Sequence, residues 1–268
     1  MRTHHIRIGL ILTLCLLGLG LNAMSQSEEV QHKEEEFSGI RSIEIENKSI
    51  DVDIRRTEGS SRIISKLHEM RELHIQQNGD ELSIRVSTKT VFGVGNVHEY
   101  IEVLVNDESS ISINSGSGDI SVEGIDLQEL MVENGSGDLE ISRCRGRMTI
   151  SSSSGDQHYS DVHGSLELKL SSGDLSLQGV TGVRSIETSS GDVDGSLRLE
   201  GDISIRSSSG DVNIDLENSK EELSFRLDVG SGKLRIDDIR SEDSLSIGDG
   251  PITITGVSGS GDQTYRIQ

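Results

Sequence analysis

The sequence predicts an all-β fold, a single-stranded parallel β-helix (β-solenoid) with about 18 residues in each coil. A phrase close to "SSGDLSLQGV" returns at a nearly fixed interval, and short apolar alternations flank each copy. The chain has 30 Gly and one Pro, which suits many turns that require positive φ. Only 32% of the residues are hydrophobic and Trp is absent, so a thin, repeated core is expected instead of one thick interior.

Residues 1–25 are predicted to be a signal peptide. "MRTHHIR" is a basic segment, and the apolar run that follows it is shorter than the ~20 residues that span a bilayer. Small residues at Ala23 and Ser25 suit a signal peptidase. Cys15 follows Leu14 in the middle of the apolar run, which argues against lipidation. We therefore expect export to the periplasm or the cell surface, with no membrane insertion after cleavage.

The next two segments lead into the repeats. Residues 26–36 are highly charged and low in hydrophobic residues, so we expect a disordered acidic linker. Residues 37–110 are expected to form a less regular, β-rich N-terminal part of the solenoid, because "IRSIEIENKSIDVDIR" alternates apolar and polar residues. Asn78 and Gly79 lie between two alternating runs, a pattern typical of a β-hairpin.

Residues 111–268 carry the repeats. With few exceptions, such as Gln157 and Gly195, apolar residues stand two and four positions after the hinge glycines and five positions before them, as strands with one buried face require. Stacked coils would bury these residues in internal ladders about 4.8 Å apart. We expect the hinge glycines to have positive φ. They are Gly118, Gly137, Gly155, Gly173, Gly191 and Gly210, with two degenerate copies at Gly232 and Gly250.

An aspartate follows each regular hinge glycine, and in a solenoid these side chains would stack along one edge. They could form a cation-binding or acidic recognition ridge. The reading that we favour is a turn cap, in which each carboxylate bonds backbone N–H groups of its own corner. Lys233 replaces the aspartate in the coil after Asp211 and is expected to end the row. The six aspartates are Asp119, Asp138, Asp156, Asp174, Asp192 and Asp211.

The least regular coil contains "QHYSDVH", from Gln157 to His163. His158, Asp161 and His163 could converge on a metal ion, since imidazole and carboxylate are metal ligands. Neighbouring residues on a strand and a turn need not face the same way, however. We expect a solvated, variable coil here, with no metal and no cofactor.

Cys144 is the only cysteine outside the export segment, so no internal disulfide can form after cleavage. It lies seven residues after a hinge glycine, a position where other coils carry aliphatic residues. We expect a buried thiol with a packing role. The other members of this predicted column are Ile125, Val162, Val180, Ile239 and Val257.

The phrases "SGSGDISVEGI", "GSGDLEI" and "SSGDVNIDL" resemble the bacterial putative-adhesin family, a domain of unknown function related to the head GIN domain. The resemblance covers roughly residues 40–265. It implies a right-handed parallel β-helix in an exported or surface-associated bacterial protein. The chain departs from the pattern where Lys233 and Pro251 replace the hinge aspartate, and where Gln157 and Tyr159 occupy core columns.

The formal net charge of −21 disfavours binding to nucleic acid or to anionic membranes. The sequence has no G-x-S-x-G elbow, no H-E-x-x-H motif and no phosphate loop. We therefore expect an exported, non-catalytic, adhesin-like structural or interaction module with an unknown protein or cell-surface partner. The alternative is a carbohydrate-active β-helix enzyme that uses stacked carboxylates.

Overall fold

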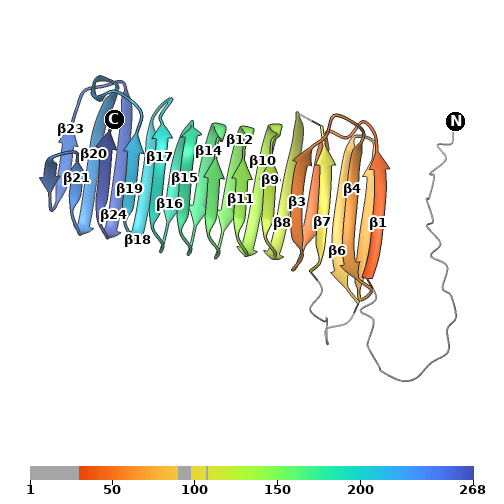
Figure 1. The fold of residues 1–268 in the computed structure, drawn as a ribbon. Helices are drawn as coiled ribbons and strands as arrows, with labels where there is room; N and C mark the ends of the chain where they lie inside the picture. The colour runs from red at the N-terminus through yellow and green to blue at the C-terminus, as the bar shows by residue number, and fades with distance from the viewer. Residues whose placement is uncertain (1–29, 90–97, 107) are drawn as a thin grey trace, which may run out of the picture.

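The computed structural model describes residues 30–89, 98–106 and 108–268, and it confirms an all-β solenoid (Figure 1). Two long sheets face each other along the rod. Sheet A has 13 strands and sheet B has 12. In the described residues the only helical element is a 3₁₀ turn, η1 (Lys220–Glu222), so no described helix could cross a bilayer. The predicted signal peptide lies outside the described residues.

Six consecutive coils form the regular middle of the rod. Each has a strand in sheet B, a hinge, and a strand in sheet A. Strands pair in parallel with the coils on either side, as Ile150 with Leu168 and Ile141 with Tyr159. The strands are β8 (Ser109–Ser117), β9 (Ile120–Glu123), β10 (Asp126–Ser136), β11 (Leu139–Ser142), β12 (Arg145–Ser152), β13 (Gln157–Ser160), β14 (His163–Leu170), β15 (Leu175–Thr181), β16 (Val183–Thr188), β17 (Val193–Arg198), β18 (Ile203–Ser209) and β19 (Val212–Leu216).

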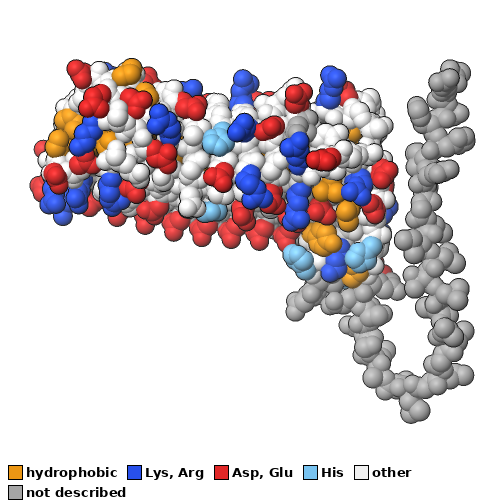
Figure 2. Space-filling view, turned by 45° about the horizontal axis from the view of Figure 1, so that its top comes forward, with side chains coloured by type: hydrophobic (Ala, Val, Ile, Leu, Met, Phe, Trp, Pro, Cys, Tyr) orange, Lys and Arg blue, Asp and Glu red, His pale blue; other side chains and the backbone are white. Residues whose placement is uncertain are grey.

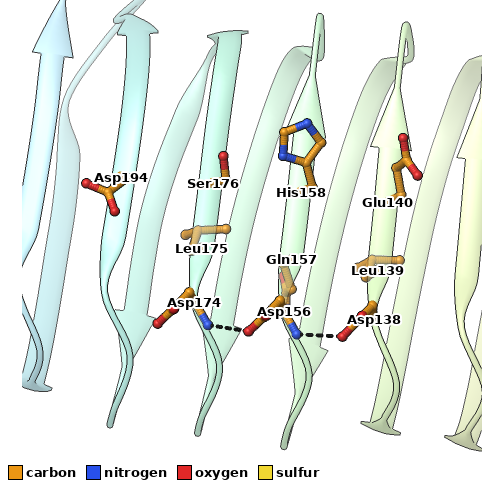
Figure 3. A pocket seen from close by; sticks show the side chains of 10 residues that line it. All are labelled: Asp138, Leu139, Glu140, Asp156, Gln157, His158, Asp174, Leu175, Ser176 and Asp194. Carbon is orange, nitrogen blue, oxygen red and sulfur yellow. Dashed lines mark hydrogen bonds between the residues drawn. The ribbon is translucent and has the colours of Figure 1, made fainter.

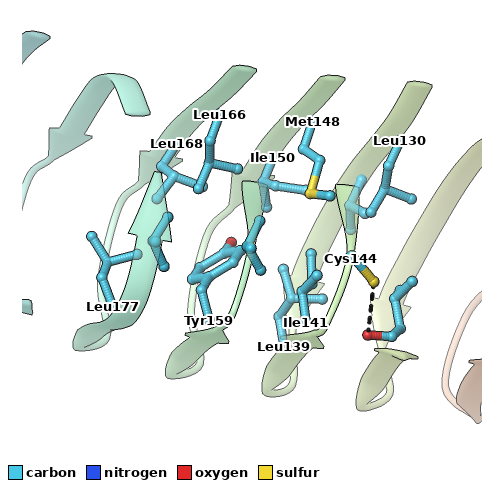
Figure 4. Close-up of a cluster of buried hydrophobic side chains, with 14 of the residues drawn as sticks. Leu130, Leu139, Ile141, Cys144, Met148, Ile150, Tyr159, Leu166, Leu168 and Leu177 are labelled. Carbon is cyan, nitrogen blue, oxygen red and sulfur yellow. Dashed lines mark hydrogen bonds between the residues drawn. The ribbon is translucent and has the colours of Figure 1, made fainter. Parts of the chain in front are cut away.

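The core lies between the two sheets, and each coil contributes a few aliphatic side chains to it (Figure 4). Met148 and Leu166 approach from sheet B, whereas Ile141 and Leu177 approach from sheet A. All four are at most 2% exposed. A coil alone could not bury these residues, so burial depends on the stacking of neighbouring coils.

The chain changes its order of stacking at the N-terminal end. β2 (Ser42–Asn47) and β3 (Asp51–Arg56) form the coil beside β8 and β9. β6 (Glu81–Thr88) and β7 (Tyr100–Val105) then form a coil outside it. Antiparallel strands cover this end: β1 (Val30–Phe37), β4 (Ser61–His68) and β5 (Arg71–Asn78).

One prediction for this end is confirmed and another is wrong in part. The hairpin at Asn78 and Gly79 is confirmed, because β5 and β6 pair antiparallel and Gly79 has a φ of +67°. The disordered linker predicted for residues 26–36 is wrong for residues 30–36, which belong to β1. The open edge of β4 offers unpaired backbone groups, and β1 satisfies them without needing an apolar sequence. Ion pairs such as Arg62 with Glu34, at 3.3 Å, add to this pairing.

The C-terminal end also departs from sequence order. β20 (Leu223–Ser231) and β21 (Leu234–Ile236) form the outermost coil. The antiparallel strands β22 (Ile239–Ser241) and β23 (Ser244–Ile247) cover that coil. The last two strands, β24 (Ile252–Ser260) and β25 (Gln263–Ile267), then insert between this coil and the coil of β18 and β19.

The predicted hinge at Gly250 is therefore wrong. The residues after it belong to sheet B, where Ile252 pairs with Leu223. The hinge of this coil is Gly261, which has a φ of +119° and is followed by Asp262. Glycine and aspartate occur in the segments around both Gly250 and Gly261. The motif alone therefore does not distinguish a hinge from the turn that precedes a strand of sheet B.

Candidate functional site

The hinge aspartates form one continuous row along an edge of the rod, visible as a line of acidic side chains in Figure 2. The structure places all six predicted aspartates in it and adds Asp51 and Asp262 from the rearranged ends. We call these eight residues the acidic ridge. In spatial order they are Asp51, Asp119, Asp138, Asp156, Asp174, Asp192, Asp211 and Asp262.

Each carboxylate of the acidic ridge caps the next coil. The backbone N–H of Asp174 donates to Oδ1 of Asp156 at 2.9 Å, and the N–H of Asp192 donates to Oδ1 of Asp174 at 2.9 Å (Figure 3 shows the bonds around Asp156). The predicted bond within each corner is wrong. The bond joins two coils, because the stacked hinges bring the carboxylate of one coil close to the backbone N–H of the next.

This bonding offsets the repulsion within the acidic ridge. Carboxylates about 5 Å apart repel by about 0.8 kcal/mol in a water-like dielectric. A hydrogen bond to a charged group contributes about 1.5–3 kcal/mol. The spacing of the row is therefore compatible with a stable fold without any bound cation.

The hinge glycine is required for two reasons, which Gly173 illustrates. Its φ is +100°, a conformation that residues with a side chain rarely adopt. A Cβ built there would also lie 2.1 Å from the carbonyl oxygen of Gly155 in the preceding coil. The predicted positive φ is confirmed at six hinges, Gly137, Gly155, Gly173, Gly191, Gly210 and Gly232, but it is wrong for Gly118 and Gly250. The close approach of the stacked hinges adds a second constraint, which also applies at Gly118, where a Cβ would lie 2.0 Å from the carbonyl oxygen of Ile50.

A Lys and a His residue stand at the two ends of the acidic ridge. The backbone N–H of Lys233 donates to Oδ1 of Asp262 at 2.8 Å, so Lys233 does end the row. It follows Asp262, however, and not Asp211 as the order of the sequence suggested. At the other end, Nδ1 of His98 lies 3.4 Å from Oδ2 of Asp51.

A trough of about 500 Å³ runs beside the acidic ridge on the outer face of sheet A (Figure 3). Its far side is a second row of outward side chains, three residues after successive hinge glycines. Sequence reasoning did not select this row as a unit, although its constant offset from the hinge could have revealed it. The row is Glu140, His158, Ser176 and Asp194, whose strands pair in register. The trough can offer carboxylates, an imidazole and a hydroxyl to a polar or cationic ligand.

The possible metal ligands in the irregular coil do not converge. His158 is exposed on β13, Asp161 forms the corner with a φ of +53°, and His163 begins β14. Nδ1 of His163 lies 3.2 Å from Oγ1 of Thr181 in the next coil. Across the part of the chain that the structure describes, no three His, Cys, Asp or Glu side chains are grouped to hold a metal ion.

Cys144 lies inside the core, as predicted (Figure 4). Its thiol donates to the carbonyl oxygen of Ser142 at 3.2 Å, and burial raises the pKa of the thiol. Two predicted members of its column are wrong: Ile239 is 48% exposed and Val257 is 43% exposed. Both belong to the rearranged C-terminal end, where the count from the hinge no longer applies.

The same irregular coil places polar groups in the core. The hydroxyl of Tyr159 donates to Oε1 of Gln157 at 2.5 Å, and both residues are at most 2% exposed. Nε2 of Gln157 has no hydrogen-bond partner. Burial raises the pKa of Tyr159 well above its usual value. Tyr265 and Gln263 repeat the pair in β25, but there Nε2 donates to the carbonyl oxygen of Asp228.

Comparison with known proteins gives one family. The profile of the Toastrack DUF4097 family matches residues 40–268. A solved "putative adhesin" from Bacteroides fragilis is 14% identical, covers 90% of this chain and 98% of its own, and has a TM-score of 0.42. A "putative lipid binding protein" from Parabacteroides distasonis is 15% identical, with 89% and 97% covered and a TM-score of 0.44. No protein of curated function matches this chain.

Proposed function

This chain belongs to the Toastrack DUF4097 family, and from that premise we propose that it is an exported, non-catalytic, adhesin-like interaction module. Its partner in this proposal is a protein or another component of a cell surface. The adhesin-like part of the proposal rests on the resemblance of the repeated hinge phrases to the bacterial putative-adhesin family. The net charge of −21 disfavours nucleic acid and anionic lipid surfaces as partners.

The observation that carries the proposal is the bonding of the acidic ridge. One oxygen of each carboxylate accepts a backbone N–H from the next coil, as Asp174 does from Asp192. A general acid or base must exchange a proton with a substrate, and it works best when its pKa is tuned near the working pH. Carboxylates that cap backbone amides serve the stacking of coils instead. This supports a rod whose acidic groups are structural.

Export is the part of the proposal that rests on the sequence alone. We propose that residues 1–25 are removed during secretion, so that the mature chain begins shortly before β1. Mass spectrometry of the secreted or periplasmic protein tests this directly. The expected N-terminus follows Ala23 or Ser25, and a mature protein that still carries Met1 would refute it.

The interaction role is tested with the mature protein and cells of the source organism. A strain that lacks the protein should attach less well to surfaces or partner cells, and added purified protein should restore attachment or compete with it. The protein should release no reducing ends from a panel of neutral and acidic polysaccharides. Normal attachment by the deletion strain would refute the adhesin-like role.

The trough beside the acidic ridge keeps a carbohydrate-active enzyme as a second candidate, because Glu140, His158 and Asp194 are titratable groups in one groove. Release of reducing ends that is lost in both Glu140→Gln and Asp194→Asn would favour this enzyme. An activity that survives both changes would come from a contaminant.

A further inference from the structure

The open edges at the ends of the two sheets differ in how they are protected. β22 and β23 have only three and four residues. β1 has eight residues but carries consecutive charges from Lys33 to Glu36. Short strands and charged side chains are the usual means by which an open edge avoids pairing with another chain. Three of the four edges are therefore protected.

The fourth edge belongs to β5, which is long and is charged only at its start, at Arg71 and Glu72. β5 has eight residues, and from Leu73 to Asn78 it contains no Lys, Arg, Asp or Glu. It pairs with β6 on one side, and within the described residues no strand pairs with its other side. Leu73 and Ile75 are only partly buried against the core. Figure 2 shows hydrophobic side chains on the surface at this end of the rod.

Sheet A extends one strand further than sheet B at this end. β4 and β5 are consecutive strands, joined by a turn at Glu69 and Met70, and they lie in opposite sheets. β1 lies beyond β4 in sheet A, and among the described residues no strand of sheet B lies beyond β5. The strand counts of 13 and 12 record this difference. One added strand beside β5 would make the two sheets equal.

The inner face of β1 indicates what such a strand would meet. Phe37 and Glu35 lie opposite Ser61 and Ile63 of β4, which are buried, so they share the face that is turned toward the core. Phe37 is partly buried there, and Nζ of Lys33 is 2.8 Å from Oε1 of Glu35. The core-facing side of β5 thus carries Leu73 and Ile75, and that of β1 carries Phe37 and, further along, Glu35.

We propose that the open edge of β5 accepts a β-strand from a partner protein, which completes sheet B opposite β1. Backbone hydrogen bonds to β5 would supply affinity, and alternate apolar side chains would pack toward the core. Basic residues at the outward positions of the partner strand would complement the net charge of −21. The inference deepens the proposed function by naming a contact surface and the class of partner.

A second copy of this chain fits the same place less well. If two β5 strands paired, each copy would bring its own β4 and β1 into sheet A at the junction. The β1 of one copy would then meet the β4 of the other, because sheet A is one strand longer than sheet B at this end. An extended segment of another protein has no such obstacle.

The probe for this site is a fluorescein-labelled peptide, KLSIRVST, the sequence of β6 with Lys in place of Glu81. β6 already pairs with β5, so its alternation suits a neighbour of this strand. Fluorescence anisotropy with the mature protein should show saturable binding. N-methylation of alternate peptide amides should weaken binding at least tenfold, because it removes the backbone donors. Equal binding of the methylated peptide would overturn the proposal.

Variants of the protein locate the binding. Ile75→Lys places a charge toward the core side of the open edge and should weaken peptide binding at least tenfold. Ile239→Lys is the matched control, since Ile239 is 48% exposed on β22 at the other end; it should change binding less than twofold. Equal effects of the two changes, or no binding at 1 mM peptide, would overturn the proposal.

Hydrogen exchange in the wild type gives a test that does not depend on whether the Ile75→Lys variant folds. The peptide should slow amide exchange in β5 and leave exchange in β22 unchanged, and unchanged exchange in β5 would overturn the proposal.

Sedimentation of the wild type tests whether a second copy of this chain occupies the open edge of β5 instead. A dimer that Ile75→Lys converts to a monomer would assign the edge to a second copy. None of these measurements depends on export or attachment, so their failure leaves the proposed function standing.

Discussion

The middle of the rod and its two ends use the same coil but different orders of stacking. In the middle, the six coils from β8 to β19 are stacked in the order in which they occur in the sequence. At the N-terminal end the coil of β6 and β7 lies outside that of β2 and β3, and at the C-terminal end β24 and β25 insert between two earlier coils. The hinge phrase therefore determines the shape of a coil, whereas the order of coils depends on contacts outside the phrase.

The acidic ridge shows why the order is free to change. Asp211 accepts the N–H of Asp262, 51 residues away, at 2.8 Å, and the bonds between consecutive coils have nearly the same length. A hinge can thus stack on any other hinge. Antiparallel strands that cover the outermost coils, such as β23 on β20, fix the ends and stop further stacking.

The largest effect is expected from ending the chain at Asp249. This removes β24 and β25, which are last in sequence but internal in the stack, where β24 pairs with both β18 and β20. The C-terminal coils should lose their core and become sensitive to limited proteolysis. A chain that starts at Ser38 is the control, since it loses only β1, which pairs with β4 alone. Equal protease resistance of the two truncated proteins would contradict the inserted coil.

Two glycine substitutions separate the middle from the ends. Gly173→Ala combines a positive φ with a Cβ 2.1 Å from a backbone oxygen, so it should lower the free energy of unfolding by about 3 kcal/mol. Gly79→Ala has a positive φ but nothing within 4 Å, and should cost about 1 kcal/mol. Denaturant unfolding measures both. Equal losses would mean that the close approach of the hinges is unimportant.

The buried glutamine pairs offer a smaller contrast. Nε2 of Gln157 is unpartnered in the middle, whereas Nε2 of Gln263 donates to Asp228 near the C-terminal end. Replacing both Gln157 by Leu and Tyr159 by Phe should leave the stability unchanged or raise it by about 1 kcal/mol, because no polar group is then left unpaired. The same pair of changes at Gln263 and Tyr265 should lower it. Melting temperatures of the two double variants test the difference.

The smallest effect is expected at Cys144, which lies in the regular middle. Its thiol is buried and its pKa is raised, so iodoacetamide should react only after denaturation. Cys144→Val should change the free energy of unfolding by less than about 1 kcal/mol. Rapid labelling of the native protein, followed by mass spectrometry, would show that this coil opens readily.

The sequence sufficed for the middle of the rod and was less informative at the ends. Local patterns of 18 residues or fewer predict the hinge glycines, the hairpin at Gly79 and the burial of Cys144. The hinge at Gly261 was missed because "GDGPITI" and "SGSGDQTYRI" carry similar turn residues. β1 was missed because its stability comes from the edge of β4 and not from its own composition.

The candidate site, too, could be predicted from the sequence only in part. The alignment of hinges predicted that six aspartates stack, and the structure places them in one row. Their hydrogen-bond partners were not predictable, because the choice between the same corner and the next coil depends on how the stacked hinges are offset. The second row of the trough, from Glu140 to Asp194, was predictable from its constant offset of three residues after the hinge glycines, and the pairing register of four strands confirms that it is continuous.

The most direct test of this account is amide hydrogen exchange at Asp192 in the wild type, Asp174→Asn and Asp174→Ala. The N–H of Asp192 donates to Oδ1 of Asp174 at 2.9 Å, on the exposed edge of the rod. We predict that exchange at this amide accelerates at least tenfold in Asp174→Ala, much less in Asp174→Asn, and that millimolar calcium leaves the wild type unchanged. Unchanged exchange in Asp174→Ala, or strong calcium-dependent protection of the wild type, would contradict coil-to-coil capping by the acidic ridge.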